Sequence, residues 1–355
     1  MYSGFPLMYG GFSLLYGDIG PKYGAITLLY SGFPEKYGGR YNTVKKSAKR
    51  NDRFNQNKQK GSFALTVQKI TVVGAGVMGR GIAYVSALAG FSTTLVDVSG
   101  VKLEEAITYA KRTSEKGMKL GKVTTEQARN MTANLRTSPV LEEASKTADF
   151  IIEAVPEKRD LKKSVMETAS ANAPDHAILT SNTSTISPTE LASYTNRPGQ
   201  FAVMHFFNPV HRMRLVEMVK GLDTEDETVA AIRSVAEQMG KETVEVNEFP
   251  GFVTSRISAL VGNEAFLMLQ EGVAAAEDID KAIKLGLNYP MGPLELGDLV
   301  GLDARLNNLK YLHETLGEKY RPAPLLEQYV KAGRLGRKSG RGVYDYTEKS
   351  ELVKK

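Results

Sequence analysis

The chain lacks cysteine entirely and has only four histidines among its 355 residues. The absence of cysteine excludes disulfide bonds and thiolate metal sites, and it is typical of proteins from a reducing compartment. No apolar stretch approaches the roughly 20 residues that span a bilayer, and the N-terminus lacks the basic segment and unbroken apolar core of a signal peptide. We therefore expect a cytoplasmic protein with no metal site and no membrane partner.

An excess of positive charge is missing from most of the chain, although the overall net charge is +6. Residues 1–60 contain ten Lys/Arg and three Asp/Glu, so they carry +7 and leave −1 for residues 61–355. A near-neutral globular part gives no reason to expect nucleic acid as a partner. Its 42% hydrophobic and 24% charged residues are ordinary for a globular protein, and the length suits about two domains.

The first forty residues are a tandem repeat of seven residues. Tyrosine recurs at Tyr2, Tyr9, Tyr16, Tyr23, Tyr30 and Tyr37. Glycine and proline in these units cost about 1 and 3 kcal/mol in a helix interior, so the heptad does not predict a coiled coil. A polar linker rich in Lys, Asn and Gln follows over 42–62 and can bury little apolar area.

Three interpretations of residues 1–62 stay open. They are a disordered interaction tail, an ordered repeat module, or a translated tandem nucleotide repeat of seven codons that lies outside the functional protein. We favour the third. No Met occurs between Met8 and Met78, so a later start needs a non-standard codon, such as that of Val67.

Strand-like and helix-like segments alternate from about Lys69 to residue 250. Runs rich in β-branched residues predict strands at 69–73, 93–97, 150–155, 177–181, 201–206, 215–219 and 243–246. Helical spacing predicts helices at 77–89 and within 101–134, the latter broken near Gly117 and Gly121. This alternation predicts an α/β fold with a mainly parallel sheet covered on both faces. The later pattern is wholly helical, with helices expected at 252–272, 277–286, 293–316 and 322–333. We place the two domains at 68–250 and 251–347.

A glycine motif follows the first predicted strand and opens the first predicted helix. Residues 74–79 read G-A-G-V-M-G, which matches the pattern G-x-G-x-x-G. The first glycine allows a tight turn, the second lets the backbone approach a pyrophosphate, and the third permits close packing of helix and strand. The motif predicts a doubly wound, Rossmann-type domain with cofactor-binding residues Gly74, Gly76, Val77, Met78 and Gly79.

Asp97 ends the second predicted strand, 18 residues after Gly79. A carboxylate there accepts hydrogen bonds from ribose hydroxyls and repels a 2′-phosphate, so we expect NAD rather than NADP. The alternative is a glycine-rich turn followed by a helix-capping aspartate.

His205 and Glu217 are twelve residues apart on two short predicted strands. A bend between the strands would bring imidazole and carboxylate together, and such a carboxylate fixes the tautomer of a histidine that acts as acid and base. Beside an NAD site the pair suggests hydride chemistry at an alcohol carbon. The alternatives are a buried histidine bonded to a backbone carbonyl and a strand carboxylate that points to solvent.

Several longer segments carry a family resemblance. They read V-V-G-A-G-V-M-G, I-I-E-A-V-P-E, S-N-T-S, H-F-F-N-P-V, L-V-E-M-V, P-G-F-V, M-G-P-L-E-L-G-D-L-V-G-L-D and G-R-K-S-G-R-G-V-Y-D-Y. From about Gln68 to Tyr346 the chain resembles the L-3-hydroxyacyl-CoA dehydrogenases, most closely the short bacterial 3-hydroxybutyryl-CoA dehydrogenases. The resemblance implies NAD as cofactor, an acyl-CoA substrate, and a homodimer formed by the helical C-terminal domain.

The resemblance also implies residue roles. His205 is the acid/base, Glu217 orients it, and Ser184 bonds the C3 oxygen of the substrate. Asn208 lies near the nicotinamide ribose, and Glu157 and Lys162 contact the ribose and nicotinamide side of the cofactor. The alternative for Glu157 and Lys162 is an ordinary surface charge pair.

Two features concern the substrate. The family has asparagine within P-G-F-V-x-N-R, whereas this chain has Ser255 there; serine offers one short donor, so a water would complete the contact with the substrate carbonyl. Lys116, Lys119 and Lys122 stand where related enzymes bind the phosphates of coenzyme A, and the alternative is a solvated lysine face.

Other functions stay open at this level. An NAD-dependent sugar-acid dehydrogenase of the gulonate type would use the same fold, and a non-catalytic NAD-binding scaffold would not need Ser184, His205 and Glu217 together. Nucleic-acid binding would depend on residues 1–60 alone.

Overall fold

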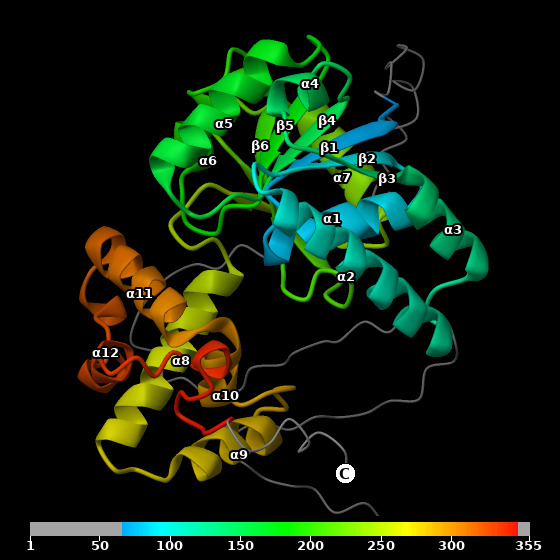
Figure 1. Ribbon diagram of the computed structural model, residues 1–355. Helices are drawn as coiled ribbons and strands as arrows, with labels where there is room; N and C mark the ends of the chain where they lie inside the picture. The colour runs from blue at the N-terminus through cyan, green and yellow to red at the C-terminus, as the bar shows by residue number, and fades with distance from the viewer. Residues whose placement is uncertain (1–65, 347–355) are drawn as a thin grey trace, which may run out of the picture. The chain divides into compact units, whose positions relative to one another are not determined.

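The structure, a computed structural model, describes residues 66–346 (Figure 1). The predictions for residues 1–62 lie outside the described residues. In chain order the strands are β1 (Lys69–Val73), β2 (Ser92–Val96), β3 (Leu135–Ser138), β4 (Phe150–Glu153), β5 (Ile178–Ser181), β6 (Phe201–Phe206), β7 (Leu215–Lys220) and β8 (Glu242–Asn247). The helices between them are α1 (Val77–Leu88), α2 (Gly100–Lys119), α3 (Thr125–Asn134), α4 (Leu141–Ser145), α5 (Arg159–Asn172), α6 (Pro188–Ala192) and α7 (Asp226–Gln238). The helices after the sheet are α8 (Thr254–Gln270), α9 (Ala276–Gly286), α10 (Pro293–Val300), α11 (Leu302–Leu316) and α12 (Pro324–Lys331).

The eight strands form one sheet in the order β3-β2-β1-β4-β5-β6-β7-β8. Strands β1 to β6 are parallel, β7 pairs antiparallel with β6, and β8 runs parallel to β7. The order reverses direction between β1 and β4, and ligands of doubly wound folds bind at the carboxyl ends of strands beside such a switch point. The predicted doubly wound α/β fold is confirmed.

Helices cover both faces of the sheet (Figure 1). One apolar cluster joins the sheet to α1, α2, α3 and α7 through residues such as Ile82, Leu103 and Ile232. The other cluster joins it to α5 and α6 through Met166 and Leu191. The strands β1, β4, β5 and β6 are almost wholly buried, as expected for parallel strands covered on both faces.

Two local predictions were wrong in part, and one strand was missed. The break expected within 101–134 lies near Gly121, between α2 and α3, but Gly117 does not break the helix, because α2 continues to Lys119. A Cβ at Gly117 would lie 2.4 Å from Val123 Cγ2 of the chain that follows the helix. The helix expected over 293–316 is divided at Gly301, whose φ of +106° breaks the helical backbone. Strand β3 was not predicted because its sequence L-R-T-S is polar, and three of its four residues are only partly buried or exposed at the edge of the sheet.

The part of the chain after Gly251 is helical, as predicted. Ala259 and Phe266 of α8 pack with residues of α10, α11 and α12 in one apolar core. The buried Asp280 accepts hydrogen bonds from the N–H groups of Leu294 and Glu295 at 2.9 Å each, which satisfies the start of α10. In the described part of the chain, helices long and apolar enough to cross a membrane do not occur.

Candidate active site

The glycine turn joins β1 to α1 at the switch point of the sheet. Gly74 has a φ of +103° and a Cβ there would lie 2.8 Å from the carbonyl oxygen of Ala154, so only glycine fits the turn. A Cβ on Gly79 would lie 1.7 Å from the Gly74 oxygen, whereas one on Gly76 would meet no atom within 4 Å. The backbone at Gly76 is therefore open, and α1 begins there without a side-chain cap. This arrangement fits a dinucleotide phosphate at the helix N-terminus.

Asp97, directly after β2, is hydrogen-bonded to the glycine turn. Its carboxylate accepts hydrogen bonds from the N–H groups of Ala75 and Ser99, each at 2.9 Å. The N-cap of α2 is Ser99, whose hydroxyl accepts from the N–H of Lys102, so Asp97 is not the helix cap. The helix-capping alternative is wrong.

His205 and Glu217 are direct partners on the antiparallel strands β6 and β7. His205 Nδ1 lies 2.8 Å from Glu217 Oε2. Glu217 is 0% exposed and His205 is 7% exposed, so the alternative of a solvent-facing strand carboxylate is wrong. The structure thus brings imidazole and carboxylate together, as the sequence predicted.

Thr254, at the start of α8, was not found from the sequence. Its N–H donates to Glu217 Oε1 at 3.0 Å and its hydroxyl donates to Oε2 at 3.1 Å. Burial acts to raise the pKa of Glu217, but the hydrogen bonds from His205 and Thr254 outweigh it and hold that pKa below its usual value. The rings of Phe207 and Phe252, with centroids 4.6 and 5.9 Å from the imidazole, flank His205. The signal that could have found Thr254 is its position directly after P-G-F-V.

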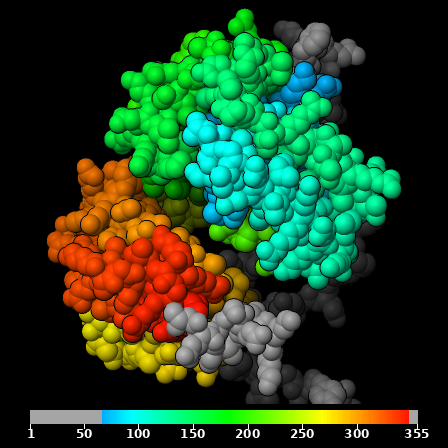
Figure 2. All heavy atoms as spheres, viewed as in Figure 1, coloured from blue at the N-terminus to red at the C-terminus, as the bar shows by residue number. Residues whose placement is uncertain are grey.

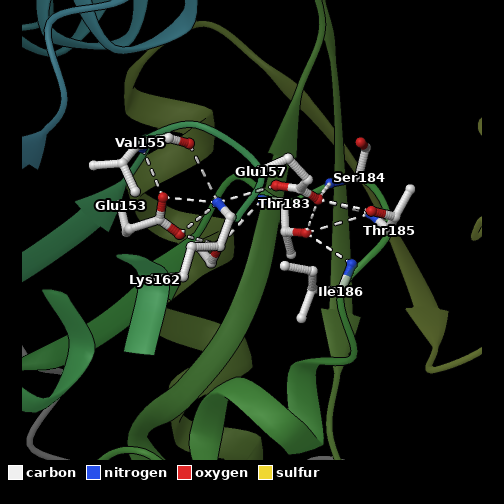
Figure 3. A network of polar contacts seen from close by, with 9 residues as sticks. Glu153, Val155, Glu157, Lys162, Thr183, Ser184, Thr185 and Ile186 are labelled. Carbon is white, nitrogen blue, oxygen red and sulfur yellow. Dashed lines mark hydrogen bonds and ion pairs between the residues drawn. The ribbon is translucent and has the colours of Figure 1, made fainter. Parts of the chain in front are cut away.

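Ser184 lies in the loop after β5. The carboxylate of Glu157 accepts hydrogen bonds from this loop (Figure 3). Glu157 Oε1 accepts from the N–H groups of Ser184 and Thr185 at 3.2 Å each, and from the hydroxyls of Thr183 and Thr185. Within residues 66–346 the hydroxyl of Ser184 itself makes no hydrogen bond, so it is available to a ligand. Asn182 Oδ1 accepts from the N–H of Phe206 at 2.8 Å and ties this loop to the end of β6 beside His205.

Lys162 does not lie at the surface of this loop. Its side chain is 1% exposed, and its ammonium contacts Glu153 Oε1 and Oε2 at 2.8 and 2.9 Å and Glu157 Oε2 at 3.1 Å. The interpretation as an ordinary surface charge pair is therefore wrong. Figure 3 shows Lys162 between the two carboxylates, with Glu157 turned toward the Thr183–Ile186 loop.

A cavity of about 1530 Å³ lies between α1, α2 and the β6–β7 loop. Val77 of the glycine turn and the exposed Asn208 both line it. So do Lys116 and Lys122, but not Lys119, although α2 remains helical to Lys119. Further cationic side chains line it that sequence reasoning missed, namely Arg80, Arg112, Arg212, Arg214 and Lys241.

Cations predominate in the lining of the cavity, where seven Lys/Arg side chains stand against two glutamates, Glu104 and Glu105. The pKa of His211, which lines it, is lowered first by burial and then by the charges of Arg212, Lys241 and Lys116. Figure 2 shows side chains of the α2 segment, in cyan to blue-green, spread over the surface of the sheet-containing part. Such a concentration of cations attracts phosphate groups.

Ser255 is the second residue of α8, directly after Thr254, and is partly buried. In the described part of the chain its hydroxyl has no hydrogen-bond partner. Ser255 follows Thr254, which donates two hydrogen bonds to Glu217. The departure from the family pattern therefore lies next to the His205–Glu217 pair.

The fold and the site define a class: a dinucleotide-dependent oxidoreductase with a doubly wound cofactor domain and a histidine–carboxylate pair. The sequence model described as 3-hydroxyacyl-CoA dehydrogenase, NAD binding domain, matches residues 69–249, and that of the C-terminal domain of the same enzymes matches residues 251–346. The chain belongs to the 3-hydroxyacyl-CoA dehydrogenase family, and its cofactor is NAD.

Individual relatives agree with the family. A probable 3-hydroxybutyryl-CoA dehydrogenase of Bacillus subtilis is 46% identical over 287 residues, which are 81% of this chain and 100% of that protein. The 3-hydroxybutyryl-CoA dehydrogenase of Bradyrhizobium diazoefficiens is 42% identical over 290 residues, 80% of this chain and 97% of that one. The solved (S)-3-hydroxybutyryl-CoA dehydrogenase of Ralstonia eutropha superposes with a TM-score of 0.75 at 40% identity, covering 79% of this chain and 99% of that chain.

Proposed function

We propose that the protein catalyses the reversible, NAD-dependent oxidation of (S)-3-hydroxyacyl-CoA to 3-oxoacyl-CoA, with 3-hydroxybutyryl-CoA as the substrate. The observation that carries the proposal is the buried His205–Glu217 pair, joined at 2.8 Å and held by Thr254. Relatives covered over almost their full length are 3-hydroxybutyryl-CoA dehydrogenases. The sugar-acid alternative is not favoured.

The hydrogen bonds assign the proton on His205. Glu217 is ionised at neutral pH because its pKa is lowered against the effect of burial, so it can only accept, and Nδ1 of His205 must carry the proton between them. Nε2 is then the nitrogen that takes the proton of the C3 hydroxyl during oxidation and returns it during reduction. Glu217 stabilises the imidazolium that forms. NAD, when bound, supplies the acceptor for the hydride that leaves C3.

The remaining residue roles are part of the same proposal. The free hydroxyl of Ser184 bonds the C3 oxygen, and Ser255 contributes to the carbonyl site. The glycine turn with Gly74, Gly76, Val77, Met78 and Gly79 takes the pyrophosphate, and Asp97 takes the adenosine ribose. Asn208, Glu157 and Lys162 stand on the nicotinamide side. Lys116 and Lys122 are the proposed contacts of the coenzyme A phosphates, because both line the cavity; Lys119, which the sequence also suggested for this role, does not line it.

A homodimer through the helical domain is part of the proposal, as is a cytoplasmic location. Apolar side chains that stay exposed on this domain support a partner surface; they include Ile257, Leu285, Leu287 and Val300. Single exposed apolar residues are common, but several on one helical domain favour burial against a second copy.

The test is NADH oxidation with acetoacetyl-CoA by wild type and His205→Ala. We expect wild-type turnover and a loss of kcat of about 10²–10⁴-fold in the variant, the usual contribution of a positioned acid/base. His176→Ala is the matched control, because this exposed histidine bonds Asp149 and should leave kcat unchanged. Turnover of free sugar acids in place of the CoA thioester would overturn the substrate assignment.

A further inference from the structure

His211 lies in the β6–β7 loop, on the wall of the cation-lined cavity. The reaction centre does not use this histidine, which is exposed, whereas the catalytic His205 is only 7% exposed. Histidine is the side chain whose ordinary pKa lies nearest to neutrality. Its charge on the wall of this cavity therefore depends on the charge of whatever binds there.

Contacts with two helices place the ring of His211. Its Nδ1 lies 3.1 Å from the hydroxyl of Tyr109 on α2. The rings of Tyr84 on α1 and of Tyr109 have centroids 6.4 Å from the imidazole and meet it edge to face, at 88° and 66°. The guanidinium of Arg80 lies 4.8 Å from the centre of the Tyr109 ring, so a cation stands beside the same cluster. The imidazole is thus fixed in place although it lies at the surface.

The contact with Tyr109 leaves Nε2 as the nitrogen that can serve a ligand. Neutral His211 can accept the Tyr109 proton at Nδ1, and it then carries its own hydrogen on Nε2. After protonation Nδ1 donates to the Tyr109 oxygen instead, and Nε2 keeps its hydrogen. In both states Nε2 is a donor, which suits an anion.

The groups around His211 are mainly cations. Arg212 follows it in the loop, Lys241 lies directly before β8, and Lys116 lies on α2. Partial burial is the largest cause that lowers the pKa of His211, and the charges of these three residues lower it further. A phosphate dianion among them would offset their charges. The other charged side chains that line the cavity are Arg80, Glu104, Glu105, Arg112, Lys122 and Arg214.

We propose that His211 binds a phosphate group of the coenzyme A ester beside Lys116, and that it takes up a proton as the phosphate binds. The dianion favours the imidazolium form, which adds a charge-assisted hydrogen bond that lysine and arginine cannot switch on near neutral pH. The inference rests on the proposed function, because that function brings a coenzyme A ester to the cavity. Val77 of the glycine turn lines the same cavity, so the pyrophosphate of the dinucleotide is the second source to test.

Binding of the phosphate should weaken as the pH rises. The pKa of His211 in the free protein lies below its ordinary value, and the bound phosphate raises it. Below the lowered pKa the histidine is already charged, and the ester binds with full strength. Between the two pKa values binding must take up a proton, so Kd rises with pH. Above the raised pKa only a neutral N–H remains, and Kd levels off.

The experiment measures the Kd of acetyl-CoA by isothermal titration calorimetry from about pH 5.5 to about pH 8.5, on both sides of the ordinary histidine pKa. Acetyl-CoA carries the phosphates but has no oxygen on C3, so it is not turned over. His211→Gln is the test variant, because its amide keeps an N–H donor and cannot be protonated. At the acidic end it should bind about fivefold more weakly than wild type, and at the basic end the two should agree within about twofold. His176→Gln is the matched control, since this exposed histidine bonds Asp149 and does not line the cavity.

The uptake of protons is measured by repeating the titrations in two buffers of different ionisation enthalpy. Near neutral pH, wild type should take up a larger fraction of a proton per acetyl-CoA than His211→Gln. The 3′-phosphate has its own second pKa of about 6, but this titration is common to both proteins and cancels in the comparison. The difference between the two proteins therefore reports on His211.

Two further ligands identify the phosphate. If acetyl-dephospho-CoA, which lacks the 3′-phosphate, abolishes the pH-dependent difference between wild type and His211→Gln, the 3′-phosphate is the partner. If the difference persists, the partner is the pyrophosphate of coenzyme A. Either result supports the proposal, whereas a difference seen with NADH and not with acetyl-CoA would overturn it in favour of the dinucleotide.

Other outcomes would also overturn the proposal. Equal Kd values and equal proton uptake in wild type and His211→Gln at every pH would show that the histidine does not contact the phosphate. A weakening of the same size at every pH would assign His211 a merely structural role. Failure of wild type to bind acetyl-CoA would instead overturn the proposed function.

Discussion

The reaction centre and the cation-lined cavity are built on opposite principles. His205 and Glu217 are buried. His205 Nδ1 lies 2.8 Å from Glu217 Oε2, and Glu217 also accepts from the N–H and the hydroxyl of Thr254 at 3.0 and 3.1 Å. Lys116 and Lys122 are exposed on the cavity. The first region depends on a few exact contacts, whereas the second depends on the sum of many charges.

This difference predicts different sensitivities. A buried charge–charge contact that loses one partner leaves the other desolvated, so a single change there is costly. Exposed charges are screened and contribute little one by one. Changes in the reaction centre should therefore act on kcat, and changes in the cavity should act on the KM of the CoA ester.

The largest expected effect is that of Glu217→Gln. The amide cannot stabilise the imidazolium, and its NH₂ group would face the N–H or hydroxyl donors of Thr254. We expect kcat to fall about 10²–10⁴-fold in both directions, with a much smaller change in KM. Glu245→Gln is the control, because this exposed carboxylate stands on the neighbouring strand β8 and pairs with Lys220 and Arg233. A loss below about threefold would show that the pair does not carry the proton transfer.

The same contrast explains what the sequence could predict. The glycine turn is a local pattern, and His205 and Glu217 lie on neighbouring strands, so short-range reasoning brought them together. Thr254 contacts Glu217 across 37 residues, and Glu153 reaches Ser181 across 28. A sequence gives no distance between such segments until the sheet order is known.

The fold shows the same limit. Alternating strands and helices predicted the doubly wound sheet, because burial on both faces leaves an apolar signature in the strands. Strand β3 has no such signature, and of the two glycines expected to break the helical segment only Gly121 lies in the break, since α2 continues through Gly117 to Lys119. The cavity was predicted only through its lysines; its arginines come from α1, α2 and the β6–β7 loop, and only the fold assembles them.

An intermediate effect is expected from Lys116→Ala/Lys122→Ala. Both side chains line the cavity, so their loss should raise KM for acetoacetyl-CoA about tenfold while kcat stays nearly unchanged. The dependence of KM on salt should also weaken, since fewer screened charges remain. Lys119→Ala is the matched control from the last turn of the same helix, because Lys119 does not line the cavity. If Lys119→Ala raises KM as much as the double variant, the phosphates bind along the outer face of α2 instead.

The smallest effect is expected from Ser255→Asn, which tests where the reaction centre departs from its relatives. Asparagine offers a longer side chain with two donors, so it can reach a substrate carbonyl that serine contacts through a water. One neutral hydrogen bond contributes about 1 kcal/mol, so kcat/KM should stay the same or rise at most about fivefold. Ser255→Ala is the comparison, and it should lower kcat/KM modestly if the hydroxyl takes part. A large loss in Ser255→Asn would mean that the space beside Thr254 is shaped around serine. The carbonyl site would then be as closely packed as the His205–Glu217 pair, and the start of α8 would belong to the reaction centre.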